Sequence, residues 1–306
     1  MNEKIKVLAP AKLNLSLQVY NARPDGFHSL SSLFQTVSLY DEIIIKQTEK
    51  EEEILVTATL NGDVFALPLK NTISYAVELF RKQTGILTGL TVELKKTIPS
   101  GAGFGGGSSD GASVLRGLDY LFETKLSKSD MLKMAAKIGS DVPFFIYGGT
   151  ALITGRGEFV KPVKNASENY FVLIWPNVHC STPEAFRWLD EWRLNVQNTS
   201  KEMQNISYLS DLEQIKRVEQ KPNKWYFTNS FEIPIVEKLK PVGSALLDLQ
   251  NSGAVKACLT GSGSGVFGIY ENQQVAENAF KKLKDVWSSC WLVQTVSNLS
   301  EIQKVE

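Results

Sequence analysis

The segment Pro99-Ser-Gly-Ala-Gly-Phe-Gly-Gly-Gly-Ser-Ser-Asp110 narrows the choice of fold more than any other part of the chain. An apolar, strand-like run that ends in Lys95-Lys96 precedes it, and a helix that carries Leu115 and Leu118 on one face follows it. Glycine has no Cβ atom, so the backbone can approach a polyphosphate closely, and the N-terminus of a helix attracts negative charge. We therefore predict a phosphate-binding loop here.

Oxygen-bearing side chains follow the glycines of this loop. Ser108, Ser109 and Asp110 offer hydroxyl and carboxylate oxygens where a magnesium ion that bridges phosphates would sit. They are our candidate metal ligands. The alternative is a tight, solvent-exposed turn, but three consecutive glycines followed by Ser-Ser-Asp at a helix start favour the phosphate site.

Two other nucleotide-binding patterns compete with this interpretation. The pattern G-x-G-x-x-G occurs at residues 101–106 and again at 263–268, but such a match has little specificity by itself. A dinucleotide-binding fold would continue from the helix into a parallel strand, whereas residues 130–138 indicate a second helix. The P-loop is excluded because no Gly-Lys-Ser/Thr follows the glycines. A dehydrogenase remains an alternative that a test of nicotinamide nucleotide binding would decide.

Size and composition indicate a globular protein with two lobes. The chain has 306 residues, of which 43% are hydrophobic and 22% charged, and a single core rarely grows to this length. Basic and acidic residues both number 33, so no net field attracts nucleic acid or an anionic membrane. The most apolar stretch, residues 142–154, is much shorter than a membrane-spanning helix. We expect neither a nucleic acid nor a membrane as partner.

The cysteines and the start of the chain predict a cytoplasmic location. Cys180, Cys258 and Cys290 are odd in number and lack metal-ligand spacing, so we interpret them as reduced packing residues. The first residues show no apolar block of the kind found in a signal peptide.

Apolar runs and helix signals alternate along the chain. Strands are predicted at residues 6–19, 43–47, 54–60, 90–94, 150–154 and 170–175. Helices are predicted at residues 71–84, 108–122 and 127–139, the last opening with the capping box Ser127-x-x-Asp130. The polar stretch 155–170 predicts a boundary between two domains, 1–160 and 161–306. Residues 195–224 are predicted to form a surface excursion or a helix pair.

Three motifs together resemble the GHMP kinase superfamily. They are the loop at Pro99 to Asp110, the stretch Pro10-Ala-Lys-Leu-Asn14-Leu-Ser-Leu and the stretch Leu259-Thr-Gly-Ser-Gly-Ser-Gly265-Val-Phe-Gly. The resemblance implies an α+β, two-lobed fold, with an N-terminal lobe like domain 2 of ribosomal protein S5 and a ferredoxin-like C-terminal lobe. It also implies a kinase that uses ATP and Mg²⁺ between the lobes. The ATP contacts implied are Lys96, Pro99, Gly101, Gly103, Gly105, Gly106, Gly107, Ser108, Ser109 and Asp110.

Two further stretches resemble one family within this superfamily, the 4-diphosphocytidyl-2-C-methyl-D-erythritol kinases. They are Arg23-Pro-Asp25-Gly26-Phe27-His28-Ser-Leu and Ile138-Gly-Ser-Asp141-Val-Pro143-Phe-Phe. The resemblance implies phosphorylation of the 2-hydroxyl of a small molecule with a cytidine diphosphate head, in the methylerythritol phosphate route to isoprenoids. By resemblance, Asp141 accepts the proton of that hydroxyl, and Lys12 orients the hydroxyl and stabilises the developing charge.

The same resemblance suggests how the cytidine head is bound. Phe27 and Phe186 offer aromatic faces for a pyrimidine, and His28 can donate to and accept from a base edge. Asn14 lies on the strand face of Lys12 and can add a hydrogen bond to the substrate. The other histidine, His179, is assigned a structural role.

Structural alternatives exist for several of these residues. Asp141 precedes Val-Pro143 and could also be the N-cap of a short helix, and Phe186 could belong to the core. Phe27 stands where the family commonly has tyrosine, and Asn229-Ser-Phe-Glu232 replaces Asn-Asp-Leu-Glu. These departures affect substrate contacts more than the chemistry.

Two other functions fit part of the pattern. A superfamily kinase of the homoserine or phosphomevalonate type would share the glycine loop but not the Asp25 to His28 segment. A non-catalytic ligand-binding protein on the same fold should lack Lys12 or Asp141, and both are present. Monomer and homodimer are both compatible with the sequence.

Overall fold

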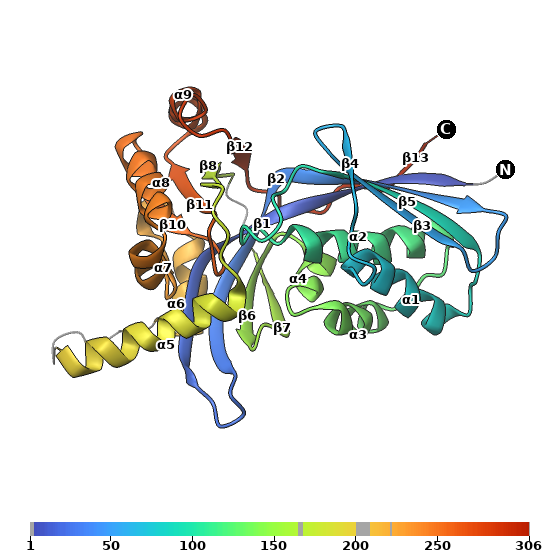
Figure 1. The fold of residues 1–306 in the computed structure, drawn as a ribbon, viewed down its shortest axis with the longest axis horizontal. Helices are drawn as coiled ribbons and strands as arrows, with labels where there is room; N and C mark the ends of the chain where they lie inside the picture. The colour runs from blue at the N-terminus through green and yellow to red at the C-terminus, as the bar shows by residue number, and fades with distance from the viewer. Residues whose placement is uncertain (1–2, 165–167, 200–208, 221, 306) are drawn as a thin grey trace.

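The computed structural model describes residues 3–164, 168–199, 209–220 and 222–305, which contain two β-sheets with helices packed against them (Figure 1). From the N-terminus to residue 163, the elements are β1 (Lys4–Ala22), β2 (His28–Thr48), β3 (Ile54–Leu60), β4 (Asp63–Phe65), α1 (Thr72–Thr84), β5 (Gly89–Lys96), α2 (Gly106–Leu121), α3 (Lys128–Ile138), α4 (Val142–Tyr147), β6 (Thr150–Gly155) and β7 (Phe159–Val163). The remaining elements are β8 (Tyr170–Ile174), α5 (Thr182–Thr199), α6 (Asp211–Val218), η2 (Pro222–Lys224), β9 (Thr228–Asn229), α7 (Glu232–Lys238), α8 (Lys240–Asn251), β10 (Lys256–Leu259), β11 (Val266–Tyr270), α9 (Gln273–Leu283), β12 (Cys290–Gln294) and β13 (Gln303–Lys304).

A long antiparallel pair, β1 with β2, connects the two halves of the molecule (Figure 1). Its register runs from Lys4 opposite Lys46 to Ala22 opposite His28, next to the hairpin tip. Residues 42–48 of β2, its outer part, pair with β5, and residues 30–35, its inner part, pair with β6. The inner part of β2 and the β1 residues opposite it therefore lie at the junction between the halves.

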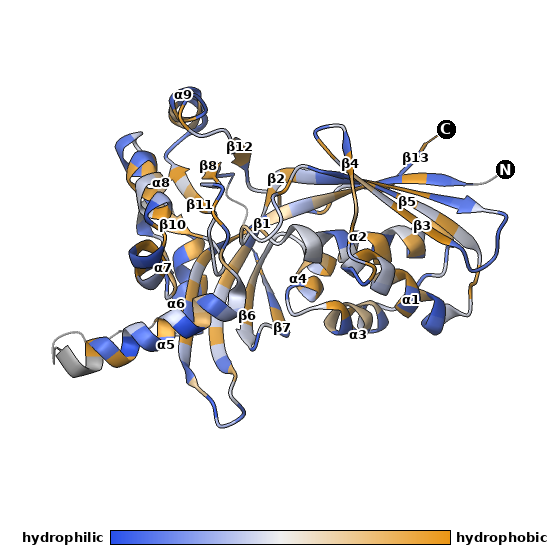
Figure 2. Cartoon of the chain, in the orientation of Figure 1, coloured by the Kyte–Doolittle hydropathy of each residue, from blue (hydrophilic) through white to orange (hydrophobic). Residues whose placement is uncertain are grey.

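Helices α1 to α4 cover one face of the larger sheet (Figure 1). Hydrophobic residues alternate with polar ones along the strands of this sheet (Figure 2), as expected where one face is buried. Helix α2 packs closely on the sheet, since a Cβ atom at Gly117 would lie 2.8 Å from Cδ1 of Ile45 and 3.1 Å from Cγ2 of Val7. This contact fixes the axis of α2, and with it the position of the glycine loop at its N-terminus.

The smaller sheet has the strand order β10-β11-β8-β12, with every pair antiparallel. Alternate residues of β8 serve two cores. Val172 and Ile174 pack in a cluster with helices α7, α8 and α9, whereas Phe171 and Leu173 pack in a second cluster with Leu13 of β1. The second cluster attaches the smaller sheet to the long β1–β2 pair.

The helix termini follow local sequence signals. The side chain of Asn71 accepts hydrogen bonds from the backbone N–H groups of Ile73 and Ser74 at the start of α1, and Gly85 ends that helix at a φ of 74°. At α3, the predicted cap at Ser127 is present, because its hydroxyl accepts a hydrogen bond from the Asp130 N–H at 3.1 Å.

The chain leaves the larger sheet between β7 and β8, near the predicted boundary after residue 160, although β9 and β13 return to the larger sheet. The boundary itself remains a prediction. In the segment predicted as a surface excursion, residues 195–199 end α5, and α6 and η2 follow, while residues 200–208 and 221 lie outside the described residues. Among the described residues, none of the helices has the length and apolar character needed to cross a membrane.

Candidate active site

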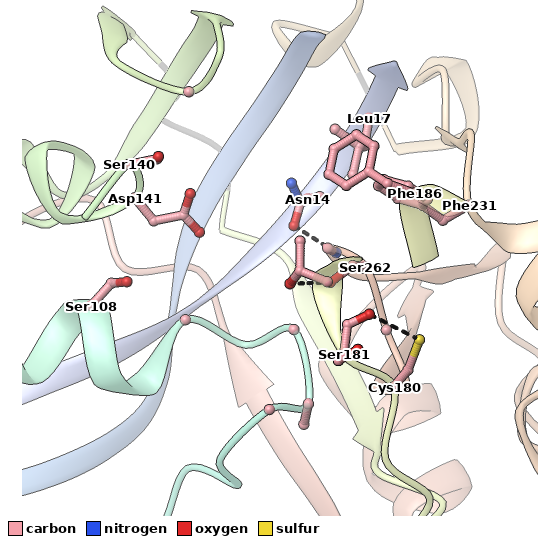
Figure 3. A pocket seen from close by; sticks show the side chains of 18 of the residues that line it. Asn14, Leu17, Ser108, Ser140, Asp141, Cys180, Ser181, Phe186, Phe231 and Ser262 are labelled. Atoms are coloured by element: carbon pink, nitrogen blue, oxygen red, sulfur yellow. Dashed lines mark hydrogen bonds between the residues drawn. The ribbon is translucent and has the colours of Figure 1, made fainter. Parts of the chain in front are cut away.

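A cavity of about 1030 Å³ opens where the glycine loop, the β1–β2 pair and the loops of the smaller sheet meet. Figure 3 shows Ser108 and Asp141 on one wall, with Phe186 and Phe231 across the cavity and Asn14 between them. Most of the residues predicted as functional line this single cavity: Lys12, Asn14, Phe27, His28, Pro99, Gly101, Gly103, Gly105, Gly106, Gly107, Ser108, Asp141 and Phe186.

Three predicted ATP contacts do not reach the cavity wall. Ser109 and Asp110 follow the wall residue Ser108, but the turn of helix α2 directs them into the protein, where both are buried. Lys96 is also buried there, and its Nζ contacts Asp41 and donates a hydrogen bond to Oδ2 of Asp110 at 2.9 Å. Direct contact of Lys96, Ser109 and Asp110 with ATP or metal stays a prediction, and in this structure the three side chains are buried behind the loop.

This buried cluster holds two carboxylates around one lysine. Asp41 also accepts hydrogen bonds from the backbone N–H groups of Thr97 and Ile98. Oδ1 of Asp110 has no hydrogen-bond partner among the described residues. Burial raises the pKa of Asp110 to about 7, with Lys96 opposing the rise and Asp41 adding to it. Burial disfavours the cation of Lys96, but the two carboxylates outweigh that effect and raise the pKa of Lys96.

Glycine occupies the positions of the loop for two different structural reasons. Gly103 and Gly105 have φ angles of 82° and 76°, and a Cβ atom would lie 2.2 Å from the carbonyl oxygen of Thr260 or 2.9 Å from Cγ of Lys12, respectively. These two positions let the loop pass between β1 and the second glycine loop. A Cβ atom at Gly107 would meet nothing within 4 Å. Because Gly107 also lines the cavity, it leaves space for a ligand rather than for the protein.

The second glycine loop, residues 259–265, is tied to the first loop and to β1. The N–H of Gly265 donates to the carbonyl oxygen of Ala102 at 2.9 Å, and the N–H of Gly261 donates to Oδ1 of Asn14 at 2.8 Å. Nδ2 of Asn229 donates to the carbonyl oxygens of Leu259 and Gly261, both at 2.9 Å. The three motifs that are far apart in the sequence therefore meet at one site.

Lys12 is held at the centre of this site. Its side chain is almost fully buried, with Nζ donating to Oδ1 of Asn14 at 2.5 Å and lying 4.5 Å from the centroid of the Phe34 ring. Nζ also lies 3.7 Å from Oδ2 of Asp141. Burial lowers the pKa of Lys12, and the Asp141 carboxylate partly opposes this. The ammonium group is therefore fixed in direction and close to a carboxylate that faces the cavity.

Asp141 occupies the N-cap position of α4, but its side chain makes no capping hydrogen bond. The helix begins instead with a proline in its first turn, which has no N–H group to satisfy. The carboxylate side chain is 32% exposed and points into the cavity (Figure 3). Of the two roles considered for Asp141, a capping side chain is not what the structure presents.

Asn14 acts mainly within the protein. Its Oδ1 accepts hydrogen bonds from Lys12, from Oγ1 of Thr260 at 3.2 Å and from the Gly261 N–H, while its Nδ2 donates to Oγ of Ser32 at 2.9 Å. The oxygen therefore has its full set of donors, and a substrate contact could use only the second N–H of Nδ2. The geometry makes Asn14 the residue that positions Lys12.

The predicted aromatic residues gather at the far end of the cavity. The rings of His28 and Phe186 are stacked with centroids 5.0 Å apart, and Phe186 meets Phe231 edge-on at 4.9 Å. Nδ1 of His28 lies 2.8 Å from the carbonyl oxygen of Tyr20, and its Nε2 lies 3.2 Å from Oδ2 of Asp190. Phe27 is 55% exposed on the hairpin tip. Phe186 therefore lies on the wall, although it also packs against a core cluster.

Two basic residues on the wall were missed by sequence reasoning. His179, assigned a structural role, lies against the glycine loop, since a Cβ atom at Gly101 would be 3.0 Å from its Cε1. Arg156 comes from the turn between β6 and β7, and its guanidinium carbon lies 4.9 Å from the centroid of the Phe27 ring. The only local signal for Arg156 was its position between two glycines.

Comparison with known proteins identifies the family. The family models described as GHMP kinases N terminal domain and GHMP kinases C terminal match residues 71–149 and 225–289. A 4-diphosphocytidyl-2-C-methyl-D-erythritol kinase from Thermodesulfovibrio yellowstonii is 33% identical over 94% of this chain and 96% of its own length. One from Thermotoga maritima is 41% identical over 87% of this chain and 92% of its own length.

A solved structure agrees with both findings. The crystal structure of a 4-(cytidine 5'-diphospho)-2C-methyl-D-erythritol kinase superimposes with a TM-score of 0.77 at 28% identity, covering 95% of this chain and 98% of the other. The α+β, two-lobed fold predicted from the resemblance is confirmed, and a kinase of the homoserine or phosphomevalonate type is not favoured. The chain belongs to the 4-diphosphocytidyl-2-C-methyl-D-erythritol kinase family of the GHMP kinases.

Proposed function

We propose that this protein transfers the γ-phosphoryl group of ATP to the 2-hydroxyl of 4-diphosphocytidyl-2-C-methyl-D-erythritol. The observation that carries the proposal is the Lys12–Asp141 pair, with Nζ and Oδ2 3.7 Å apart. This pair opens into the same cavity as the glycine loop and the aromatic cluster. Family membership supports ATP as the phosphoryl donor.

Phosphoryl transfer mostly needs positioning and charge neutralisation, so the Lys12–Asp141 pair is assigned no covalent chemistry. The carboxylate of Asp141 takes the proton of the acceptor hydroxyl. The hydroxyl oxygen forms a bond to the γ-phosphorus while the bond from that phosphorus to the bridging oxygen of ADP breaks. Lys12, aimed by Asn14, orients the acceptor oxygen and stabilises the negative charge on the transferring group.

We assign the glycine loop and the start of α2 to the phosphates of ATP. Gly107 leaves open space in the first turn of this 16-residue helix, whose N-terminal N–H groups and dipole favour anions. Ser108 lies beside it on the wall and offers a hydroxyl oxygen. Behind the loop, the hydrogen bond from Lys96 to Asp110 helps to keep the loop in place.

Magnesium is part of this proposal, and the donor set is compatible with it. No cluster of three or more histidine, cysteine, aspartate or glutamate side chains suited to a metal occurs among the described residues. Mg²⁺ in kinases needs no such cage, because it is held by one or two protein oxygens, water and substrate phosphates. Ser108 would supply such a protein oxygen. The bound ion would neutralise charge on the phosphates.

The aromatic end of the cavity is the proposed site of the cytidine head. Phe27 offers an exposed ring, while His28 and Phe186 form a stacked pair on the wall. A base bound there lies at one end of the same cavity that holds the acceptor pair, as a long substrate requires. A cytoplasmic location stays a prediction, and so does the choice between monomer and homodimer.

A coupled assay of ADP release tests the proposal. The protein is supplied with ATP, Mg²⁺ and 4-diphosphocytidyl-2-C-methyl-D-erythritol, and in parallel reactions with homoserine or mevalonate. We expect turnover with the first acceptor alone, and its loss in Lys12→Met, which rules out a contaminating kinase. Faster turnover with homoserine or mevalonate would contradict the proposal, as would binding of a nicotinamide nucleotide in place of ATP.

A further inference from the structure

A substrate with a cytidine diphosphate head carries two phosphates between its base and its acceptor hydroxyl, and the groups described so far serve only the two ends. The basic side chains on the described part of the cavity wall are Lys12, His28, Arg156 and His179. Lys12 is engaged with Asn14 and Asp141, and both ring nitrogens of His28 have partners. The diphosphate therefore needs a cation from elsewhere on the wall.

Arg156 occupies the part of the wall between the two ends. Its neighbour Gly157 packs against the residue before the acceptor carboxylate, since a Cβ atom at Gly157 would lie 3.1 Å from Cβ of Ser140. On its other side, the guanidinium of Arg156 lies 4.9 Å from the centroid of the Phe27 ring. The β6–β7 turn thus extends from the neighbourhood of Asp141 to the Phe27 ring. This is where a chain of two phosphates would pass.

The guanidinium of Arg156 is also available for an anion. Among the described residues it makes no ion pair and no side-chain hydrogen bond, and only the backbone N–H of Arg156 is used, donating to Oε2 of Glu158 at 2.5 Å. The cation–π contact with the Phe27 ring uses none of the N–H donors of the guanidinium. It leaves the N–H groups on the edge free, and these are the donors that bind phosphate oxygens in pairs.

We propose that the guanidinium of Arg156 binds the diphosphate of the nucleoside diphosphate substrate through its N–H groups. This inference rests on the proposed function, since it assumes that a cytidine diphosphate group enters the cavity. It makes Arg156 a residue that determines specificity for a substrate with phosphates beside its base. His179 lies against the glycine loop and is left to the phosphates of ATP.

Calorimetry with two probes separates the phosphate contact from the base contact. CDP and cytidine are titrated into the wild type, Arg156→Gln and Arg156→Lys, with Arg187→Gln as the control. Arg187 lies on α5, is 62% exposed and does not line the cavity. We expect Arg156→Gln to weaken CDP about ten- to hundredfold, the usual loss for a charged hydrogen bond, and to leave cytidine nearly unchanged. Arg156→Lys should restore part of the CDP affinity, because lysine keeps the charge but not the paired donors.

Other outcomes overturn the inference in distinguishable ways. Equal losses for CDP and cytidine would show that Arg156 only supports the Phe27 ring. Unchanged CDP affinity with weaker binding of a non-hydrolysable ATP analogue would assign Arg156 to the phosphoryl donor. If the wild type bound no CDP and did not phosphorylate the diphosphocytidyl substrate, the proposed function would fail together with this inference. If the wild type did both and Arg156→Gln matched it, the inference alone would be wrong.

Discussion

Nζ of Lys12 lies 3.7 Å from Oδ2 of Asp141, and the Asp141 carboxylate takes no part in capping the helix that it precedes. Asn14 fixes the direction of Nζ from the opposite side. The two charged groups are thus held by separate elements, β1 and the start of α4, and both face the cavity. A carboxylate without a structural hydrogen bond beside a buried cation is suited to accept a proton and not to maintain the fold.

The first prediction concerns this pair. Asp141→Asn keeps the size of the side chain but cannot accept the hydroxyl proton, so kcat should fall about 10²–10⁴-fold, the usual contribution of a positioned general base. Because no capping hydrogen bond is lost, the melting temperature and the affinity for ATP should stay nearly unchanged. Steady-state kinetics, thermal unfolding and calorimetry measure the three quantities.

A double variant provides the control for this assignment. Lys12→Met should also lower kcat, and Asp141→Asn combined with it should lose much less than the product of the two single losses, as groups that act on one oxygen do. Near wild-type turnover in Asp141→Asn would contradict the proton-acceptor role. Catalysis would then rest on Lys12, the glycine loop and the metal.

The second prediction concerns the Phe27 ring, which is 55% exposed on the hairpin tip. Phe27→Ala removes a stacking face for the base, a loss of about 1–3 kcal/mol per stacked base. The KM of the diphosphocytidyl substrate should therefore rise about five- to hundredfold, while the KM of ATP stays constant. Phe159→Ala is the matched control, because Phe159 is 64% exposed but does not line the cavity. Equal increases in both KM values would show instead that Phe27 shapes the site as a whole.

The local motifs predicted the fold well where one buried face dominates the sequence. The strand at residues 54–60 was predicted with the bounds of β3, and α1 and α3 agree within one residue at each end. Only residues 43–47 of β2 were predicted, because its inner half contains Ser31, Ser32, Gln35 and Thr36. These polar residues are buried by partners from distant segments, such as Gln214 on α6 and Thr150 on β6. A pattern of apolar residues cannot indicate a strand that is buried through polar contacts.

The candidate site was predictable to the extent that short motifs contain it. Lys12 and Asp141 stand in such motifs, and the structure brings them together with the glycine loop. The sequence could not indicate which side of the first turn of α2 faces the cavity, so Ser109 and Asp110 were grouped with Ser108. Arg156 and His179 belong to turns whose place depends on how the two sheets pack, and no local signal reveals that packing.

The third prediction tests the glycine loop at Gly107. A Cβ atom there meets nothing within 4 Å of the protein but enters the cavity, so Gly107→Val should fold normally and bind a non-hydrolysable ATP analogue at least tenfold more weakly. Gly105 and Gly106 are less informative, since a Cβ atom at either would lie 2.9 Å from neighbouring side chains and disturb folding. Calorimetry showing unchanged affinity in a folded Gly107→Val would contradict the loop assignment.

The last prediction concerns Asp110, whose pKa burial raises to about 7 beside Asp41, with Lys96 opposing the rise. In the unfolded chain the carboxyl loses its proton near pH 4, so between about pH 4 and pH 7 the folded state holds a proton that the unfolded state has lost. The stability of the wild type should therefore fall through this window as the pH rises.

Asp110→Asn cannot titrate and leaves one carboxylate, Asp41, with Lys96. The difference in melting temperature between Asp110→Asn and the wild type should therefore increase by a few degrees between pH 5 and pH 7.5, since 1 kcal/mol corresponds to roughly 2–4 °C in chains of about 150–250 residues and to somewhat less in a longer chain. Asp130→Asn is the control, because the hydrogen bond from Ser127 keeps the pKa of Asp130 below its usual value, outside the window. If the melting temperatures of the wild type and Asp110→Asn changed in parallel with pH, Asp110 would be ionised throughout, and the two carboxylates would both be charged around Lys96.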